Sequence, residues 1–166
     1  EGLRETEAAL RERGIRFVLR RGSPDRVALE LARNAALLVC DRGYTRVQRH
    51  WRATVAQEAL CPVVQVEADV VVPVEVPAEK AEHAAHTLRL RVQRLLPTYL
   101  QPLPALSPLR NSLDLSVEGE SLADLDAFLA GLSLDRTVPP VHHFFRGGAS
   151  EALRELQSIV GSLRGY

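Results

Sequence analysis

The chain has 166 residues, which suits one domain, or one compact domain with part of a second. Lys plus Arg and Asp plus Glu are each 21, so the net charge is zero and no overall basic excess favours nucleic-acid binding. Two cysteines, no basic-then-apolar leader and no apolar stretch of membrane-spanning length exclude a disulfide framework and favour a cytoplasmic protein without membrane or metal partners.

The first half alternates between helical and strand patterns. Ser23, Pro24 and Asp25 suit the first turn of a helix, and AALLVC is a continuous apolar run typical of a buried parallel strand. Strands alternating with helices indicate parallel βαβ units, with helices covering the sheet. The predicted elements are a helix over 3–13 that stops at Gly14, a strand over 15–20, a helix from 23, a strand over 35–40, a helix over 44–60 and a strand over 62–67.

The second half is predicted to be helical. Pro73 makes residues 70–76 an edge strand or an extended crossing segment. A long helix follows over 78–96, and four prolines mark 97–120 as a linker. Ser121 and Asp124 have capping-box spacing for the next helix. A last helix from near Ser150 is expected to bury five apolar residues: Leu153, Leu156, Ile159, Val160 and Leu163.

The turn from Asp41 to Tyr44 follows the apolar strand at 35–40. Ligands of open parallel sheets bind outside the carboxyl ends of the strands. Asp41 could accept a hydrogen bond from a ligand, Gly43 permits close approach, and Tyr44 could stack on it. The alternative is that Asp41 caps the following helix and Tyr44 belongs to the core.

Four arginines accompany this turn, at spacings that share one face of a helix. Such a face could bind phosphate groups, or it could be an ordinary solvated surface. Tyr44, Val47, Trp51 and Val55 would share another face. The arginines are Arg42, Arg46, Arg49 and Arg52.

Three features near the C-terminus carry weaker signals. His142 and His143 are adjacent, and adjacent side chains point apart on a regular element, which disfavours chelation of a metal. Phe144 and Phe145 fit core or interface anchors better than base-stacking residues. The run 146–148, Arg-Gly-Gly, precedes a helix and could bind an anion, or could be a helix-start turn without a ligand. No Ser/His/Asp set, carboxylate pair or cysteine nucleophile can be assembled.

Four segments, in order, resemble the DNA photolyase/cryptochrome family, most closely class II cyclobutane pyrimidine dimer photolyases. They are LRERGIRFVLRRGSPDRV with AALLVCDRGYTRVQRHWR, then CPVVQVEADVVVPVEV, then EKAEHAAHTLRLRV, and VPPVHHFFRGGASEALRELQSIVGSLRGY. Two positions depart from the class II pattern, which usually has arginine where His86 stands and proline where Leu90 stands. The chain also contains no methionine, and we expect it to be a piece of a longer protein.

The resemblance implies a partial Rossmann-like α/β antenna domain over residues 1–77, a helix and proline-rich linker over 78–120, and the start of an all-α FAD-binding domain over 121–166. In that family, light excites reduced FAD, an electron passes to the dimer in UV-damaged DNA, and the cyclobutane ring splits. The parent would be a deoxyribodipyrimidine photo-lyase and a monomer. The chain alone is expected to be inactive because most of the FAD site lies elsewhere.

At residue level, the resemblance implies that Tyr166 contacts FAD and that Asp41, Arg42 and Tyr44 belong to a loop beside a deazaflavin or folate antenna. It assigns no catalytic residue here, and Trp51 cannot be the electron relay of the helical domain. The alternatives are a cryptochrome-like blue-light photoreceptor and a stand-alone nucleotide-binding α/β module.

Overall fold

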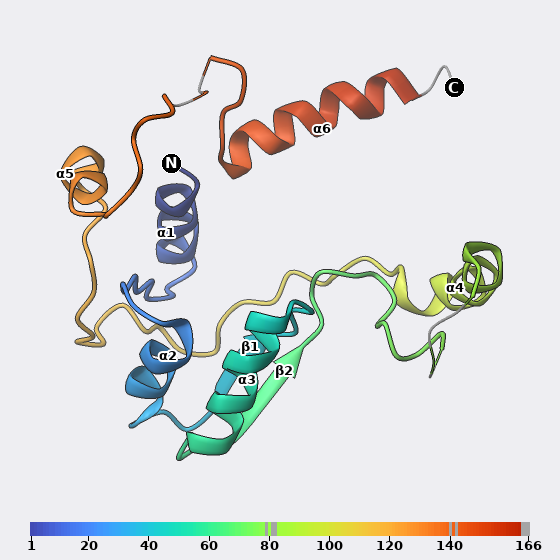
Figure 1. Cartoon of the computed structure of the whole chain (residues 1–166), viewed down its shortest axis with the longest axis horizontal. Coiled ribbons are helices and arrows are strands. Elements are labelled where there is room, and N and C mark those ends of the chain that lie inside the picture. Colours follow the sequence, from blue (N-terminus) through green and yellow to red (C-terminus); the bar gives the residue numbers. More distant parts are fainter. Residues whose placement is uncertain (79, 81–82, 140, 142, 164–166) are drawn as a thin grey trace. The chain divides into compact units, whose positions relative to one another are not determined.

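The computed structural model describes residues 1–78, 80, 83–139, 141 and 143–163 (Figure 1). The chain divides into two compact units. We call Arg21–Ala105 the α/β unit, and Glu1–Arg20 with Leu106–Tyr166 the helical unit. The domain limits expected from the sequence stay a prediction.

The α/β unit contains α2 (Pro24–Ala32), β1 (Leu38–Asp41), α3 (Arg46–Glu58), β2 (Val63–Val66) and α4 (Ala85–Tyr99). Helix α2 begins where predicted, with Ser23 at the N-cap position and Pro24 in the first turn. It packs on α3, and buried Ala32, Thr54 and Val55 belong to these two helices. The two helices therefore supply much of the small core of this unit.

The two strands pair in parallel, with Leu38 opposite Val63 and Asp41 opposite Val66. This arrangement confirms the parallel α/β class predicted from the alternating pattern. Strand β1 starts three residues later than the predicted run, because its ladder begins where the Leu38 N–H donates to the Pro62 carbonyl (3.0 Å). The ladder ends as the Arg42 N–H donates to the Val66 carbonyl (2.8 Å).

The strand predicted over residues 15–20 is wrong, since no strand is assigned there. This extended segment instead runs beside the linker and is bonded to it near both ends, where the Ser112 N–H reaches the Gly14 carbonyl (2.8 Å) and the Glu120 N–H reaches the Leu19 carbonyl (2.7 Å). Between these bonds the linker contains more residues than the segment that it accompanies. The mismatch in length prevents a regular ladder from forming.

Residues 70–76 form bends and turns rather than a strand. Pro73 cannot donate to a ladder, and its carbonyl instead accepts from the Val76 N–H (3.1 Å). The following helix was predicted over 78–96, but α4 covers Ala85–Tyr99 and contains Pro97 in its last turn. Proline therefore did not end the helix at residue 96. Part of the predicted start, residues 79, 81 and 82, lies outside the described residues.

The helical unit contains α1 (Gly2–Glu12), α5 (Leu125–Ala130) and α6 (Ala149–Leu163). Gly14 follows α1 with a φ of 74°, a left-handed conformation that favours glycine, so the predicted stop is confirmed. The predicted cap of α5 is wrong by three residues. Asp124 is the N-cap and its Oδ1 accepts from the Ala127 N–H (2.9 Å), whereas Ser121 Oγ accepts from the Ala123 N–H (3.2 Å).

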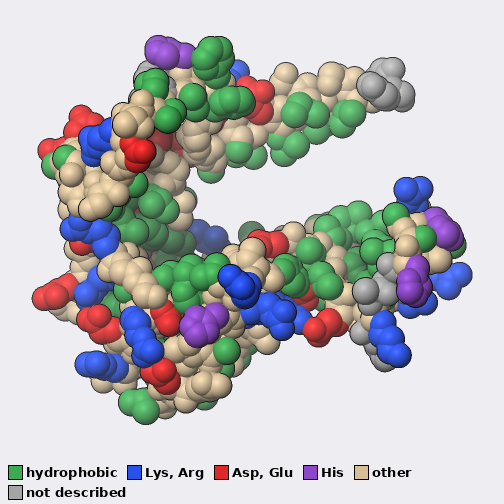
Figure 2. Space-filling view, viewed as in Figure 1, with side chains coloured by type: hydrophobic (Ala, Val, Ile, Leu, Met, Phe, Trp, Pro, Cys, Tyr) green, Lys and Arg blue, Asp and Glu red, His purple; other side chains and the backbone are tan. Residues whose placement is uncertain are grey.

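Helix α6 starts within one residue of the predicted position, but its apolar residues are not buried. Hydrophobic side chains line this helix in Figure 2. They find no covering element within the described part of the helical unit, where α6 meets α1 only near its first turn. The five residues predicted to be buried, Leu153, Leu156, Ile159, Val160 and Leu163, are between 49% and 58% exposed. Among the described helices, none is both long enough and apolar enough to cross a membrane.

Candidate functional site

The loop from Asp41 to Thr45 connects the carboxyl end of β1 to α3. Thr45 and Gln48 form a capping box: the Gln48 N–H donates to Thr45 Oγ1 (3.4 Å) and the Thr45 N–H donates to Gln48 Oε1 (3.2 Å). The alternative in which Asp41 caps this helix is therefore wrong. The sequence signal was present, since Thr45 and Gln48 have the threonine-x-x-glutamine spacing of such boxes.

Glu67 is the residue that holds this loop in place. It follows β2 directly, and its carboxylate accepts from the Tyr44 hydroxyl and from the Val74 N–H (3.0 Å). Its other oxygen lies 3.7 Å from the Arg42 guanidinium. Sequence reasoning missed Glu67. Because Asp41 and Val66 are partners in the ladder, the residues that follow them had to emerge side by side.

Arg42 also pairs with Glu75, which reaches it from the segment after β2. The hydrogen bond from Arg42 and then its charge hold the pKa of the Glu75 carboxyl below its usual range, and the same bond raises the pKa of Arg42. The side chains of Arg42 and Tyr44 are therefore already bonded to carboxylates of the chain itself. Tyr44 is 42% exposed, so it is not a core residue either.

Asp41 has different surroundings from its two neighbours. It lines a cavity of about 310 Å³ beside α2, β1 and α3, together with Trp51, Arg52 and Gly43. Neither Arg42 nor Tyr44 is among the residues that line this cavity. Of the three residues predicted for the loop site, the structure brings Asp41 alone to the cavity.

The cavity wall carries three carboxylates: Asp41, Asp69 and Asp25. Asp25 is only 6% exposed, and Ser23 Oγ donates to it. This hydrogen bond lowers the pKa of Asp25 against the opposing effect of burial. The one guanidinium on the wall, that of Arg52, donates to the Gly43 carbonyl. Acceptors beside an indole suit a flat aromatic ligand that carries N–H donors.

The predicted stripe of four arginines does not exist as one helix face. The capping box starts α3 at Arg46, so Arg42 lies in the loop. Arg46, Arg49 and Arg52 remain on the helix, and Arg52 turns back to the Gly43 carbonyl. Arg42 and Arg52 therefore bond to other parts of the chain, and Arg46 and Arg49 remain as a shorter basic face.

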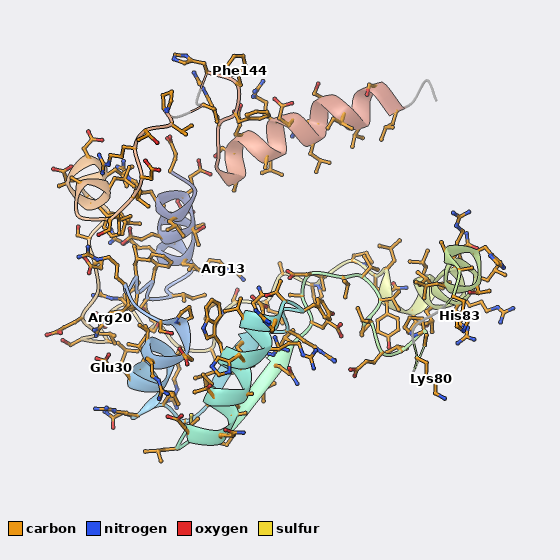
Figure 3. All side chains as sticks on the ribbon, in the orientation of Figure 1. Arg13, Arg20, Glu30, Lys80, His83 and Phe144 are labelled. Atoms are coloured by element: carbon orange, nitrogen blue, oxygen red, sulfur yellow. The ribbon has the colours of Figure 1, made fainter. Side chains whose placement is uncertain are left out.

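The C-terminal candidates are not brought to this site. His142 and Tyr166 lie outside the described residues. Phe144 and Phe145 are 83% and 77% exposed, and Phe144 stands on the loop before α6 (Figure 3). At the start of α6 the Ser150 N–H donates to the Glu5 carboxylate (3.0 Å), so a carboxylate of the chain itself occupies this helix end. The described residues contain no group of three or more His, Cys, Asp or Glu able to hold a metal ion.

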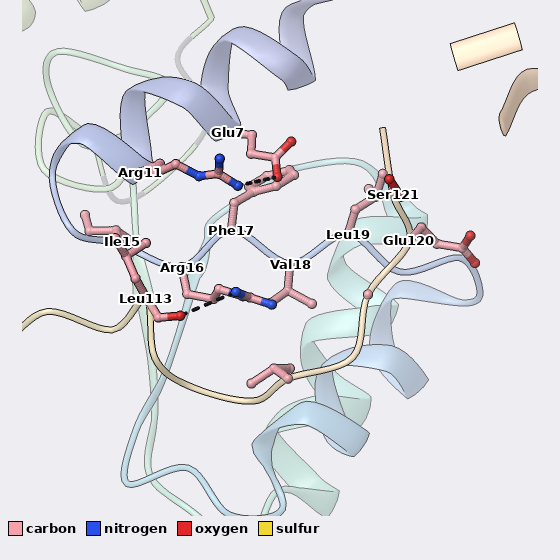
Figure 4. Close-up of a pocket in the computed structure, with 12 residues that line it drawn as sticks. Glu7, Arg11, Ile15, Arg16, Phe17, Val18, Leu19, Leu113, Glu120 and Ser121 are labelled. Atoms are coloured by element: carbon pink, nitrogen blue, oxygen red, sulfur yellow. Dashed lines mark hydrogen bonds and ion pairs between the residues drawn. The ribbon is translucent and has the colours of Figure 1, made fainter. Parts of the chain in front are cut away.

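A second cavity, of about 240 Å³, lies within the helical unit, between α1, the extended segment and the linker (Figure 4). The two arginines that line it already interact with groups of the chain itself. The Arg11 guanidinium lies 3.9 Å from Glu7, and Arg16 donates to the Leu113 carbonyl (3.4 Å). Because these arginines already have partners, the cavity beside Asp41 is the better candidate site.

The main cavities of the described residues do not involve α6, the helix that precedes Tyr166. The four main cavities in the described part of the chain have volumes of about 240 to 450 Å³, and no residue of α6 lines any of them. The expected contact, Tyr166, is beyond the last described residue of that helix. A flavin role for Tyr166 therefore stays a prediction.

Comparison with known proteins gives the family. The DNA photolyase family model matches residues 1–108. The chain is 39% identical over 153 residues to the deoxyribodipyrimidine photo-lyase of Methanothermobacter thermautotrophicus, covering 92% of this chain and 33% of that protein. It is 31% identical over 105 residues to the protein of the same name from Potorous tridactylus, covering 63% of this chain and 19% of that protein. The chain thus spans a third or less of the length of these relatives. With the family model matching well over half of its residues, the chain belongs to the DNA photolyase family.

Proposed function

We propose that the chain is part of a light-driven DNA repair lyase that splits cyclobutane pyrimidine dimers by electron transfer from reduced FAD. The observation that carries this proposal is the 39% identity to a deoxyribodipyrimidine photo-lyase across 92% of the chain. The partner is UV-damaged DNA, and the protein acts as a cytoplasmic monomer. Assignment to class II rests on the sequence resemblance.

Within this enzyme, the α/β unit serves as the antenna side. Asp41 contacts a deazaflavin or folate chromophore in the 310 Å³ cavity, and Trp51 lies against its ring system. Such a chromophore supplies light absorption when bound. Arg42 and Tyr44 act indirectly, because their bonds to Glu67 and Glu75 fix the loop that follows Asp41.

The 166 residues by themselves are proposed to bind FAD weakly and to repair nothing. Support comes from the four main cavities of the described chain, since no residue of α6 lines any of them. Tyr166 would contribute one flavin contact to a site that other parts of the protein complete.

A repair assay tests the enzymatic proposal. The natural gene product and the 166-residue chain are mixed in parallel with UV-irradiated oligothymidylate, and dimer loss is followed under blue light and in darkness. Dimer loss is expected only in light and only with the natural protein. A natural protein that binds FAD yet leaves dimers intact would favour the cryptochrome-like photoreceptor. Tight stoichiometric FAD on the 166-residue chain would overturn its proposed inactivity.

A separate titration tests the antenna cavity. A deazaflavin added to the 166-residue chain should quench the fluorescence of Trp51, the sole tryptophan. Asp41→Asn should weaken binding by about tenfold if the carboxylate accepts a ligand N–H. Asp114→Asn, an exposed change in the helical unit, is the matched control and should leave binding unchanged. Equal quenching of both variants would remove Asp41 from the site.

A further inference from the structure

A separate cavity, of about 280 Å³, lies between α3 and the sheet. Cys40 and Gln65, which are register partners in the parallel ladder, form its floor. Arg49, Ala53 and other residues of α3 form the facing wall. Because the alanine side chain is short, the helix leaves room above the strands at this point. The space is therefore created by the sequence of α3 rather than by a break in the backbone.

The polar side chains that line this cavity are mainly hydrogen-bond donors, and the rest of its wall is apolar. Arg49 and Arg52 stand one turn apart on α3, and Gln65 brings a side-chain amide from β2. No carboxylate lines the cavity. Arg52 already donates to the Gly43 carbonyl, whereas the guanidinium of Arg49 has no hydrogen bond or ion pair with a described residue. Arg49 is the guanidinium that can still take a ligand.

Two carboxylates of the elements around the cavity are already paired with other groups. Glu58, the acidic residue of α3, lies 2.6 Å from the Arg26 guanidinium. Glu67, which follows β2, accepts from Tyr44 and from the Val74 N–H. The positive charge of Arg49 is thus not neutralised by a described carboxylate of these elements.

We propose that this cavity binds a phosphate group of a small phosphorylated molecule. Two guanidiniums and an amide approach from the helix and from the strand, so the donors do not lie in one plane. A carboxylate presents two oxygens in a single plane, whereas a terminal phosphate presents three oxygens in different directions. The donor set therefore fits a tetrahedral oxyanion better than a carboxylate. Arg49 and Gln65 would hold it, with Arg52 at the side shared with the first cavity.

Isothermal titration calorimetry of the 166-residue chain with sodium pyrophosphate tests the proposal, with sodium acetate at matched ionic strength as the comparison ligand. Pyrophosphate should bind and acetate should not. Arg49→Gln should weaken pyrophosphate binding by about tenfold, as expected for one charged hydrogen bond. Arg46→Gln is the matched control, because it removes the same charge from an exposed position of the same helix that does not line the cavity. It should change the affinity by less than about twofold.

Three results would overturn the proposal. The first is an absence of binding heat with pyrophosphate up to about 10 mM. A dissociation constant above that concentration would be too weak for a specific site. The second is an equal loss in the two variants, which would mean diffuse surface attraction. The third is binding of an oligonucleotide without terminal phosphates, sensitive to Arg49→Gln, when pyrophosphate does not bind; the ligand would then be a phosphodiester backbone. The guanidinium of Arg49 is exposed and has no hydrogen bond or ion pair with a described residue, so its variant should keep the unfolding midpoint of the parent chain.

Discussion

Tyr44 donates its phenolic hydrogen to the Glu67 carboxylate, which joins the loop after β1 to the residue after β2. The side chain of Glu67 is only 10% exposed, so its bonds are partly protected from water. With Arg42 and the Val74 N–H as further partners, one carboxylate joins the end of β2 to two other stretches of the α/β unit, the loop after β1 and the segment at Val74. The strand ladder holds Asp41 opposite Val66, and this connection fixes the loop that follows Asp41.

Removal of the Glu67 charge should loosen the loop. Glu67→Gln is expected to lower the free energy of unfolding by about 1–3 kcal/mol, because it leaves partly buried donors with a poorer acceptor. Tyr44→Phe removes one bond and should cost about 1 kcal/mol. Urea unfolding followed by Trp51 fluorescence measures both. A cost for Tyr44→Phe that exceeds that of Glu67→Gln would contradict the central role of the carboxylate.

Acid should weaken the bond between Glu75 and Arg42. The folded state holds the pKa of Glu75 below its ordinary value of 4.5, so this stabilisation is fully present above that value. It is lost as the pH falls through the folded-state pKa. The free energy of unfolding of the parent chain should therefore fall more between about pH 6 and about pH 3 than that of Glu75→Gln. Glu12→Gln, on an exposed position of α1, should follow the parent.

Two glycine substitutions should act in opposite directions. Gly14→Ala forces a side chain into a left-handed conformation and brings a Cβ within 3.2 Å of the Asn111 side chain, so it should cost about 1 kcal/mol. Gly161→Ala lies inside α6 with open space around it and should gain about 0.5–1 kcal/mol through helix propensity. Thermal unfolding of the two variants checks both signs. Destabilisation by both would mean that Gly161 has a packing role.

The packing of α3 predicts a contrast between two valines. Val55 is 5% exposed, so Val55→Ala should cost about 1–3 kcal/mol through lost burial and an unfilled space. Val47, on the same helix, is 49% exposed, and Val47→Ala should change stability by less than about 0.5 kcal/mol. Chemical denaturation measures the difference. An equal loss of stability in the two variants would contradict this contrast, because Val47 is exposed among the described residues.

Local signals predicted the elements well, whereas partners between elements were harder to foresee. Pro24 stands in the first turn of α2, and Gly14 follows α1, because the preferences of first-turn proline and of left-handed glycine act within a few positions of the chain. The strand at residues 15–20 failed for the opposite reason. An apolar extended run becomes a strand only when a neighbour of matching length pairs with it, and the accompanying linker does not match.

The candidate site was predicted in part. The rule on strand ends located the loop, and Asp41 does line a cavity. The roles of Arg42 and Tyr44 depended on Glu67 and Glu75, which lie more than twenty residues further along the chain. Sequence spacing alone could not reveal these pairs. The strand register shows why Glu67 at least is a neighbour.

The bonds from Gly14 to Ser112 and from Leu19 to Glu120 join stretches that leave the ribosome far apart in time. Residues 21–105 form a compact unit from contiguous chain, so they can fold as they emerge. The first twenty residues must wait until the linker has been made. Contacts of such long sequence separation form slowly. Assembly of the helical unit is therefore expected to follow that of the α/β unit.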